Sequence, residues 1–325
     1  MHGLRGVFFQ SSFLILLWFL LETRAETHWV FTLLASVPPH VFVLPTALVI
    51  LVGLFKKRWK ALLWQGLPLL LWLFLLMGLQ LHPPRPETSN KVRVMTWNVH
   101  GGLAGLEPLL STIQHIQPEV LCLQEARITG PQIWTVLQKQ DQRWQMAQVG
   151  ELVILSRFPV VQKRWLEFPN SFHTALEATL QLPEQALSVV TVHLDRHRLG
   201  PTAWDQRMGR TLEERTHRVS GIRQDGVDVV LKSQGQAQQQ KQAFLACGDF
   251  NMPPLGPLYR QLEDRLDNAF AHSGLGFGFT WNASLKLYRI DHLWFSPDVQ
   301  TLKTWVEESK GSDHLPVVTD LQLQP

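Results

Sequence analysis

The chain has 325 residues, enough for two domains, and its net charge is +3 at pH 7. The positive excess lies in residues 1–81, which carry six Lys or Arg against two acidic residues. The remaining residues are nearly neutral and lack the strongly basic balance of a dedicated nucleic-acid-binding domain. Two cysteines, each inside an apolar run, are too few for a disulfide framework or a zinc site.

Three apolar stretches occupy the start of the chain: Val7–Leu21, Trp29–Phe55 and Leu62–Leu81. About 20 apolar residues span the core of a bilayer, so the second and third stretches are typical of transmembrane helices. The first stretch predicts either a third such helix or the apolar part of a signal peptide. We therefore expect a membrane segment of two or three helices in residues 1–81.

A basic cluster, Lys56–Lys60, separates the second apolar stretch from the third. Because positive residues stay on the cytoplasmic side, everything after Leu81 is expected to lie outside the cytoplasm. Residues 82–90 are Pro-rich and predict a short linker to a large domain over residues 91–325. Together these features predict a multi-pass protein of the cell membrane whose C-terminal domain is extracytoplasmic.

Residues 91–325 alternate between strand-like and helix-like patterns. Apolar residues at helical spacing in Leu106–Ile116, followed by Pro118, predict a helix there. Residues 205–232 are also expected to be helical, whereas the Gln-rich run Ser233–Gln242 is expected to be an exposed loop. Many strands with few intervening helices favour an α/β fold in which two packed sheets are flanked by helices. The strands are expected at residues 91–99, 119–124, 152–155, 175–182, 187–194, 243–246, 290–295, 300–305 and 317–323.

Polar side chains follow these apolar runs where the strands are expected to end. Strand ends that meet at one rim of a sheet commonly bind ligands. Glu125 directly follows the run Leu121–Gln124, and Asn98 ends another apolar run. Mg²⁺ prefers oxygen ligands and needs only one or two protein carboxylates. Glu125, Asn98 and Asp313 therefore predict a magnesium site, in which Mn²⁺ can substitute.

Acid–base candidates accompany this metal-binding set. Asp249 is placed to orient or deprotonate a water molecule, and Asn251 to hold a phosphate oxygen or to steady Asp249. His314 is a candidate general acid or base, or a phosphate ligand, and Asp291 can fix its tautomer. His193 is expected to bind a phosphate oxygen. Hydrolysis of a phosphate ester requires such a combination of a cation, an activated water and donors aimed at developing charge.

The segment from about Val92 to Leu323 resembles the endonuclease/exonuclease/phosphatase superfamily, whose members include deoxyribonuclease I. The resemblance rests on six strings, VMTWNVHGG, LCLQEA, TVHLD, CGDFNMPP, RIDHLWFS and GSDHLPVV. It implies Mg²⁺-dependent phosphoester hydrolysis on a four-layer α/β/β/α sandwich, here preceded by N-terminal transmembrane helices. It implies that Glu125 is the principal metal ligand, with Asn98 nearby and Asp313 beside the catalytic histidine. The positions that it marks as catalytic are His193, Asp249, Asn251, Asp291 and His314.

The region 195–242 is long and rich in arginine, and it departs from the family pattern where the substrate pocket is expected. Its arginines form either an anion-binding face or an ordinary solvated helix face. Elsewhere, Trp281 and Arg289 are expected to contact the substrate.

Three functions fit this sequence. The favoured one is a membrane-anchored, outward-facing, Mg²⁺-dependent phosphoesterase whose phosphorylated substrate is lipid-linked or another envelope phosphate. The second is an extracytoplasmic nuclease, for which steeply salt-dependent DNA binding is expected. The third is a catalytically inactive membrane adaptor, and it is disfavoured because each catalytic position holds the expected residue type.

Overall fold

The structure is a computed structural model that describes residues 2–83, 85–86, 90–169, 171 and 173–323. The chain divides into two compact units. The smaller unit comprises Met1–Gln80, His197–His217 and Pro254–Pro257, and the larger comprises Leu81–Arg196, Arg218–Pro253 and Leu258–Pro325. The predicted domain limits at residues 81 and 91 stay a prediction.

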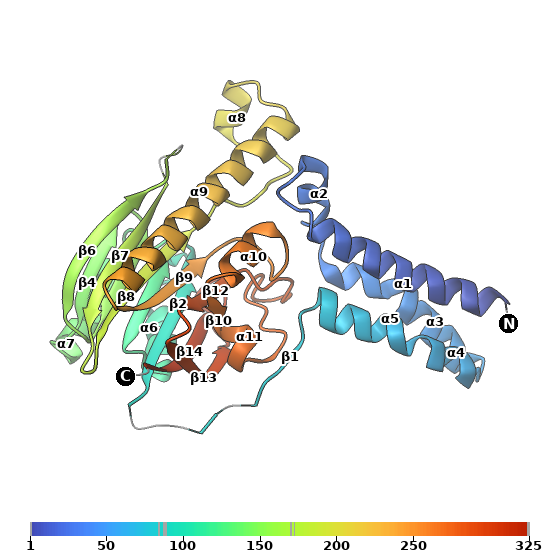
Figure 1. Cartoon of the computed structure of the whole chain (residues 1–325), viewed down its shortest axis with the longest axis horizontal. Coiled ribbons are helices and arrows are strands. Elements are labelled where there is room, and N and C mark those ends of the chain that lie inside the picture. Colours follow the sequence, from blue (N-terminus) through green and yellow to red (C-terminus); the bar gives the residue numbers. More distant parts are fainter. Residues whose placement is uncertain (1, 84, 87–89, 170, 172, 324–325) are drawn as a thin grey trace. The chain divides into compact units, whose positions relative to one another are not determined.

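The larger unit is built on two six-stranded sheets (Figure 1). The first has the order β13-β14-β2-β3-β5-β4, in which β2 and β3 run parallel and the other neighbours antiparallel. The second has the order β10-β12-β9-β8-β7-β6, in which β8 and β9 run parallel. The first sheet contains β2 Val92–Asn98, β3 Val120–Gln124, β4 Gln145–Val149, β5 Leu152–Ser156, β13 Val299–Val306 and β14 Val317–Leu323. The second contains β6 Val160–Glu167, β7 Thr174–Gln181, β8 Ala186–His193, β9 Ala243–Asp249, β10 Asp267–Asn268 and β12 Asp291–Phe295, and two short strands, β1 Gln80–Leu81 and β11 Leu275–Gly276, pair separately.

The two sheets pack face to face and helices cover their outer faces. Successive side chains of a strand point to opposite faces, so Val94 of β2 joins the core between the sheets and Met95 joins the outer cluster. Helices α6 and α7 pack on the first sheet, and α9 and α10 on the second. The result is the predicted α/β sandwich with helical outer layers. The helices are α6 Leu106–Ile116, α7 Thr129–Gln140, α8 Ala203–Arg207, α9 Leu212–Gln239, α10 Pro257–Glu263 and α11 Ala269–Ser273, with a short turn η3 at His100–Gly102.

Parallel pairing brings distant polar residues to one rim of this sandwich. Strands β2 and β3 end side by side, with Asn98 in register with Gln124. Strands β8 and β9 end with His193 in register with Asp249. Strand β12 runs antiparallel to β9 and begins at Asp291, opposite Asp249. The sheets alone therefore bring polar strand ends together before any loop contributes.

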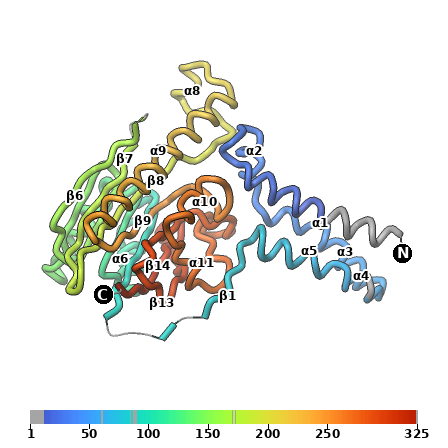
Figure 2. Tube along the Cα trace, viewed as in Figure 1, coloured from blue at the N-terminus to red at the C-terminus, as the bar shows by residue number. Residues whose placement is uncertain are grey.

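One long helix, α1, and six shorter helical elements follow one another along the described N-terminal segment (Figure 2). Its small apolar core joins Ile15 and Trp18 to Leu76, and the Trp18 ring stacks on that of Phe42 with 4.1 Å between centroids. The elements are α1 His2–Glu22, α2 Trp29–Leu34, η1 Pro39–Val43, α3 Leu44–Phe55, α4 Trp59–Trp64, α5 Gly66–Leu71 and η2 Trp72–Leu76.

The prediction of N-terminal transmembrane helices was wrong. In the part of the chain that the structure describes, no helix has both the length and the apolar character needed to cross a membrane. The second predicted span is divided, because Pro39 opens a 3-10 turn and Pro45 lies in the first turn of a new helix of only 12 residues. The third is split at Gln65 into two helices of six residues each. The same finding contradicts the predicted multi-pass membrane location. The predicted extracytoplasmic orientation of the C-terminal domain depended on that location and loses its basis.

The predicted loop over Ser233–Gln242 was also wrong, because α9 continues through most of it. Gln and Ala favour helix formation, and this end of α9 is packed against the second sheet. The Ser233 hydroxyl donates to Glu177 Oε1 at 2.8 Å, and Ala237 is buried in the cluster that α9 forms with the sheet. The Gln-rich sequence of this segment therefore belongs to a helix and not to a loop.

Candidate active site

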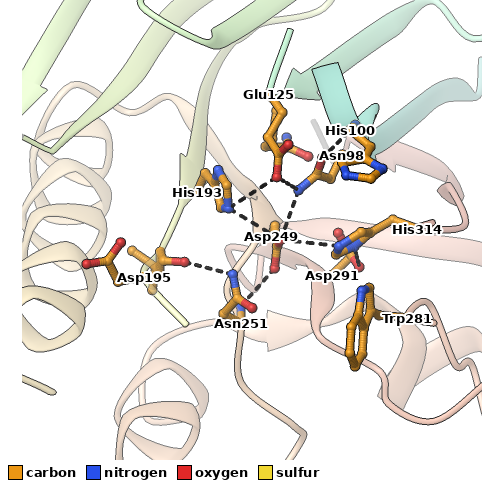
Figure 3. Close-up of polar contacts among 12 residues, drawn as sticks. Asn98, His100, Glu125, His193, Asp195, Asp249, Asn251, Trp281, Asp291 and His314 are labelled. Atoms are coloured by element: carbon orange, nitrogen blue, oxygen red, sulfur yellow. Dashed lines mark hydrogen bonds and ion pairs between the residues drawn. The ribbon is translucent and has the colours of Figure 1, made fainter. Parts of the chain in front are cut away.

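Glu125 lies one residue beyond β3, in the left-handed backbone region at φ 54°. Such strained positions in non-glycine residues cluster at functional sites. Asn98 holds its carboxylate, since Asn98 Nδ2 donates to Glu125 Oε1 at 3.0 Å and to Asp249 Oδ2 at 3.1 Å (Figure 3). Asn98 Oδ1 accepts from the backbone N–H of His100 at 3.0 Å. Asn98 thus presents N–H groups to the two carboxylates and ties three strand ends together.

Asp249 is buried at the centre of the site. Gly248 before it has φ 139°, and a Cβ there would lie 2.0 Å from the carbonyl oxygen of Val192. The backbone N–H of Asn251 donates to Asp249 Oδ1 at 2.9 Å, and the Asn251 amide donates to the carbonyl oxygen of Leu194 at 2.8 Å. Asn251 therefore steadies Asp249. Burial and then the charge of a neighbouring carboxylate raise the pKa of Asp249, and nearby histidines offset part of the rise.

His314 lies between two carboxylates. Its Nδ1 donates to Asp291 Oδ2 at 2.9 Å, and its Nε2 lies 3.7 Å from Asp249 Oδ2 (Figure 3). Burial alone would lower the pKa of His314, but the charge of Asp291 and the hydrogen bond to it outweigh burial and raise the pKa to about 9. The Ser312 hydroxyl supports the loop by accepting from the His314 backbone N–H and donating to the Asn98 carbonyl oxygen. His314 is therefore protonated at neutral pH.

His193 closes the opposite side of Asp249. Its Nε2 lies 3.6 Å from Asp249 Oδ2 and 4.0 Å from Glu125 Oε1, while its Nδ1 donates to Glu151 Oε1 at 2.9 Å. Burial alone would lower the pKa of His193, but the bond to Glu151 and the charge of Asp249 raise it to about 9. Glu151 was not predicted as a site residue. The usable signal was its place directly before an apolar strand.

Asp313 is held by two ring side chains. Its Oδ1 lies 3.3 Å from Nδ1 of His100, and its Oδ2 accepts from Nε1 of Trp281 at 3.3 Å. The Trp281 ring centroid lies 6.4 Å from that of His314, and the indole also stacks on Tyr288. The structure thus brings Asp313 and Trp281 to the rim. It adds His100, which lies in a motif string but was not predicted as a site residue.

Arg289 makes packing contacts instead. It is 4% exposed, its Nη1 donates to the carbonyl oxygen of Phe277 at 3.3 Å, and its guanidinium lies 4.8 Å from the ring centroid of Phe270. His292 beside it is also buried, and burial lowers its pKa to about 4. The structure brings the other predicted site residues together and gives Arg289 a place in the interior. Its predicted contact with substrate stays a prediction.

The ligand atoms that the side chains present at this rim fit a divalent metal ion. The Glu125 side chain is 33% exposed, and its Oε2 meets no donor among the described residues. Carboxylate oxygens of this kind suit Mg²⁺ or Mn²⁺. Ligand-capable atoms of Asp249, Asp291 and His314 also lie within 4.8 Å of one another. Oε2 of Glu125 is the ligand atom at this rim with no hydrogen bond among the described residues, whereas Nδ1 of His314 is already bound to Asp291, so Glu125 is the better anchor.

A sequence profile described as the Endonuclease/Exonuclease/phosphatase family matches residues 95–314. The matched region contains β3, β8, β9, the end of β2 and every rim residue described above. The chain belongs to this family. Members of the endonuclease/exonuclease/phosphatase family are metal-dependent phosphoesterases and nucleases, so the resemblance noted in the sequence is confirmed at that level.

Solved structures share the fold of this family member. The human nocturnin catalytic domain with bound sulfate has a TM-score of 0.55 at 19% identity, over 72% of this chain and 94% of that one. D. rerio TDP2 with a single-strand DNA product gives 0.53 at 17% identity, over 72% and 100%. Mannosyl-6-phosphatase of Bacteroides thetaiotaomicron gives 0.54 at 16% identity, over 71% and 100%. At these identities the likeness establishes the fold alone, and no curated protein sequence matches the chain significantly.

Proposed function

We propose that this chain is a metal-dependent phosphoric ester hydrolase that cleaves its substrate by direct attack of water. The observation that carries the proposal is the place of Asp249, between the imidazoles of His193 and His314 at 3.6 and 3.7 Å. A buried carboxylate with a raised pKa is suited to accept a proton from water. The two flanking imidazolium groups are suited to a phosphate and to a leaving oxygen.

Four side chains of this chain divide the work. Asp249 accepts a proton from the attacking water, whose oxygen forms the new bond to phosphorus. The bond between phosphorus and the leaving oxygen breaks, and that oxygen keeps the bonding electrons. His314 donates its Nε2 proton to this oxygen, so the products are an alcohol and a phosphate, while Asp291 keeps His314 cationic and oriented. His193 binds a non-bridging phosphate oxygen.

Glu125 is the proposed main ligand of the metal, and Asp313 and Asn98 are proposed to lie next to the metal. A bound Mg²⁺ or Mn²⁺ supplies positive charge beside the phosphate and reduces its repulsion of the attacking water. Asn98 contributes by holding Glu125 and Asp249 at a fixed separation through its two N–H contacts. His193, whose Nδ1 donates to Glu151, is the second cationic group of the site beside His314.

Small phosphate esters are the proposed substrates. Residues 82–325 carry 24 Lys or Arg and 25 Asp or Glu, whereas a nuclease gains its affinity from neutralising many backbone phosphates. The lipid-linked substrate expected from the sequence depended on a membrane segment and loses its basis. The inactive adaptor is disfavoured, because the side chains that the chemistry needs converge around Asp249.

The test measures phosphate release by the full-length protein from p-nitrophenyl phosphate and inositol phosphates, and nicking of plasmid DNA, with Mg²⁺ and with EDTA. Activity should require the metal and should fall to background in Glu125→Gln. The matched control is Glu107→Gln, an exposed carboxylate in α6. Activity that survives EDTA, or a fully active Glu125→Gln variant, would contradict the proposal. Nicking of plasmid in preference to the small esters would favour the nuclease.

A further inference from the structure

Arg196 is a cation at the rim whose partner is an aromatic ring. It lies three residues beyond β8 and is exposed, and its Cζ lies 5.3 Å from the centroid of the Trp281 ring. The neighbouring carboxylate, Asp195, pairs instead with His173, with 3.0 Å between Oδ1 and Nε2. Among the residues that the structure describes, no carboxylate forms an ion pair with Arg196. The guanidinium is held while its N–H donors remain available.

Trp281 connects Arg196 to the reacting groups. Its Nε1 donates to Asp313. The centroid of its ring lies 6.4 Å from that of the His314 imidazole, and Figure 3 shows the two rings near each other. The indole is braced by stacking on Tyr288, with 5.9 Å between centroids and 26° between planes. A single aromatic side chain therefore separates the guanidinium from the proposed general acid.

This place suits a second anionic group of the substrate. A phosphate at the centre of the site would meet the rings of His193 and His314, which flank Asp249 at 3.6 and 3.7 Å. Arg196 lies one aromatic ring further out, where its planar guanidinium can bind a pair of phosphate oxygens. The rim carries six acidic side chains, so an arginine beside it favours anions that these carboxylates would otherwise repel. They are Glu125, Glu151, Asp195, Asp249, Asp291 and Asp313, each of which pairs with a histidine.

We propose that Arg196 binds a second phosphate group of the substrate, next to the phosphate that is hydrolysed. This inference rests on the proposed function and deepens it, because it names the substrate class: esters that carry two phosphate groups. Trp281 acts as a positioning residue that orients the guanidinium through its ring face. A purely structural cation–π pair would stabilise the loop but would not distinguish substrates by their number of phosphates.

The experiment compares adenosine 3′-monophosphate with adenosine 3′,5′-bisphosphate, which differ by one phosphate group. Full-length protein with Mg²⁺ should release the 3′ phosphate from the bisphosphate with a kcat/KM roughly tenfold or more above that for the monophosphate. Arg196→Gln should remove this preference through a higher KM for the bisphosphate, whose kcat/KM should fall to that for the monophosphate. A wild-type protein without the preference, or a variant that keeps it, overturns the proposal.

Matched variants separate recognition from folding. Arg265→Gln changes another exposed arginine of the same unit and should keep the preference. Trp281→Phe keeps a ring under Arg196 and should keep most of it, whereas Trp281→Leu should lose it. Adding Arg196→Gln to Trp281→Leu should then cost nothing further. A full effect of Arg196→Gln in the Trp281→Leu background would overturn the positioning role of Trp281.

A binding measurement distinguishes failure of this inference from failure of the proposed function. Calorimetric titration with adenosine 3′,5′-bisphosphate in EDTA needs no turnover. If neither nucleotide is hydrolysed but the bisphosphate binds wild type roughly tenfold more tightly than Arg196→Gln, the second phosphate site stands without the hydrolase. If hydrolysis proceeds and both proteins bind the bisphosphate equally, the hydrolase stands and this inference is wrong.

Discussion

Nε2 of His314 lies 3.7 Å from Oδ2 of Asp249, although the two residues belong to different sheets. His314 precedes β14 of the first sheet, and Asp249 ends β9 of the second. A buried amide fixes the packing of the sheets close to this contact. Gln124 Nε2 donates to the hydroxyl of Thr96 in its own sheet at 3.1 Å and to that of Thr191 in the other sheet at 2.9 Å. The proposed acid–base pair therefore depends on the sandwich being formed.

Replacing Asp291 by Asn tests the role of the His314 contact. The carboxamide can still accept from Nδ1, so the fold should survive, but the charge that keeps His314 cationic is lost. We expect kcat to fall about 100-fold or more while KM changes little, as measured by steady-state hydrolysis with Mg²⁺. Asp264→Asn, at an exposed carboxylate, is the control and should be fully active. An unchanged kcat in Asp291→Asn would remove His314 from the mechanism.

Replacing Glu151 by Gln tests phosphate binding by His193. The loss of the carboxylate lowers the pKa of His193 from about 9, so the ring binds phosphate less well near and above neutral pH. Inhibition by inorganic phosphate should weaken roughly tenfold, as measured by the inhibition constant at pH 8. Glu167→Gln, at an exposed position of β6, should leave that constant unchanged. Equal inhibition of all three proteins would show that Glu151 does not control this site.

Local sequence predicts much of the rim, because apolar runs end in polar residues that are uncommon inside a buried strand. The strands that end at Asn98 and Asp249 are buried along nearly their whole length, so their terminal polar groups stand out from the pattern. The strands predicted at residues 175–182 and 187–194 are confirmed as the antiparallel pair β7 and β8. Which ends meet is set by the two parallel pairings, and these follow from the packing of the whole chain.

Other features leave no local signal. Strand β6 is an edge strand in which apolar side chains such as Val161 and Trp165 are exposed beside polar ones, so its run lacks a clear apolar pattern. Glu151 acts through His193, which is far from it in sequence. The N-terminal apolar stretches are hydrophobic enough and long enough for membrane spans, but hydropathy takes no account of residues that interrupt a helix. Prolines and turns divide the second and third stretches, and Ile15 and Trp18 of the first pack into a small core.

The stability of the first sheet should depend on a charge cluster at Asp320. Arg93 Nε and Nη2 donate to its two oxygens at 2.6 and 2.9 Å, and Lys91 Nζ lies 3.2 Å from Oδ2. Burial alone would raise the pKa of Asp320, but Arg93 and Lys91 lower it below the ordinary value of 3.8. Asp320→Asn should lower the free energy of unfolding by about 2 kcal/mol near neutral pH.

The pH dependence of that difference follows from the direction of the shift. A lowered pKa contributes stability above pH 3.8, and this contribution is lost as the pH falls through the lower value of the folded state. The difference in the free energy of unfolding between wild type and Asp320→Asn should therefore become smaller below pH 3.8, as measured by urea denaturation. Asp298→Asn, at an exposed turn, should behave as wild type throughout. A gap that persists unchanged in acid would mean that the pair acts through packing and not through charge.

Gly248 should tolerate no side chain, because a Cβ there would meet the backbone of β8. Its φ is 139°, and a Cβ would lie 2.0 Å from the carbonyl oxygen of Val192, its register partner. That oxygen is backbone and can move only if the parallel pair opens, so Gly248→Ala should lower the free energy of unfolding by about 3 kcal/mol or more. Hydrolysis should be lost with it, because Asp249 is the next residue. Gly221→Ala, on an exposed and open face of α9, should instead gain roughly 0.5–1 kcal/mol. A Gly248→Ala protein with wild-type stability in urea and full activity would show that the site does not require this close approach of the two strands.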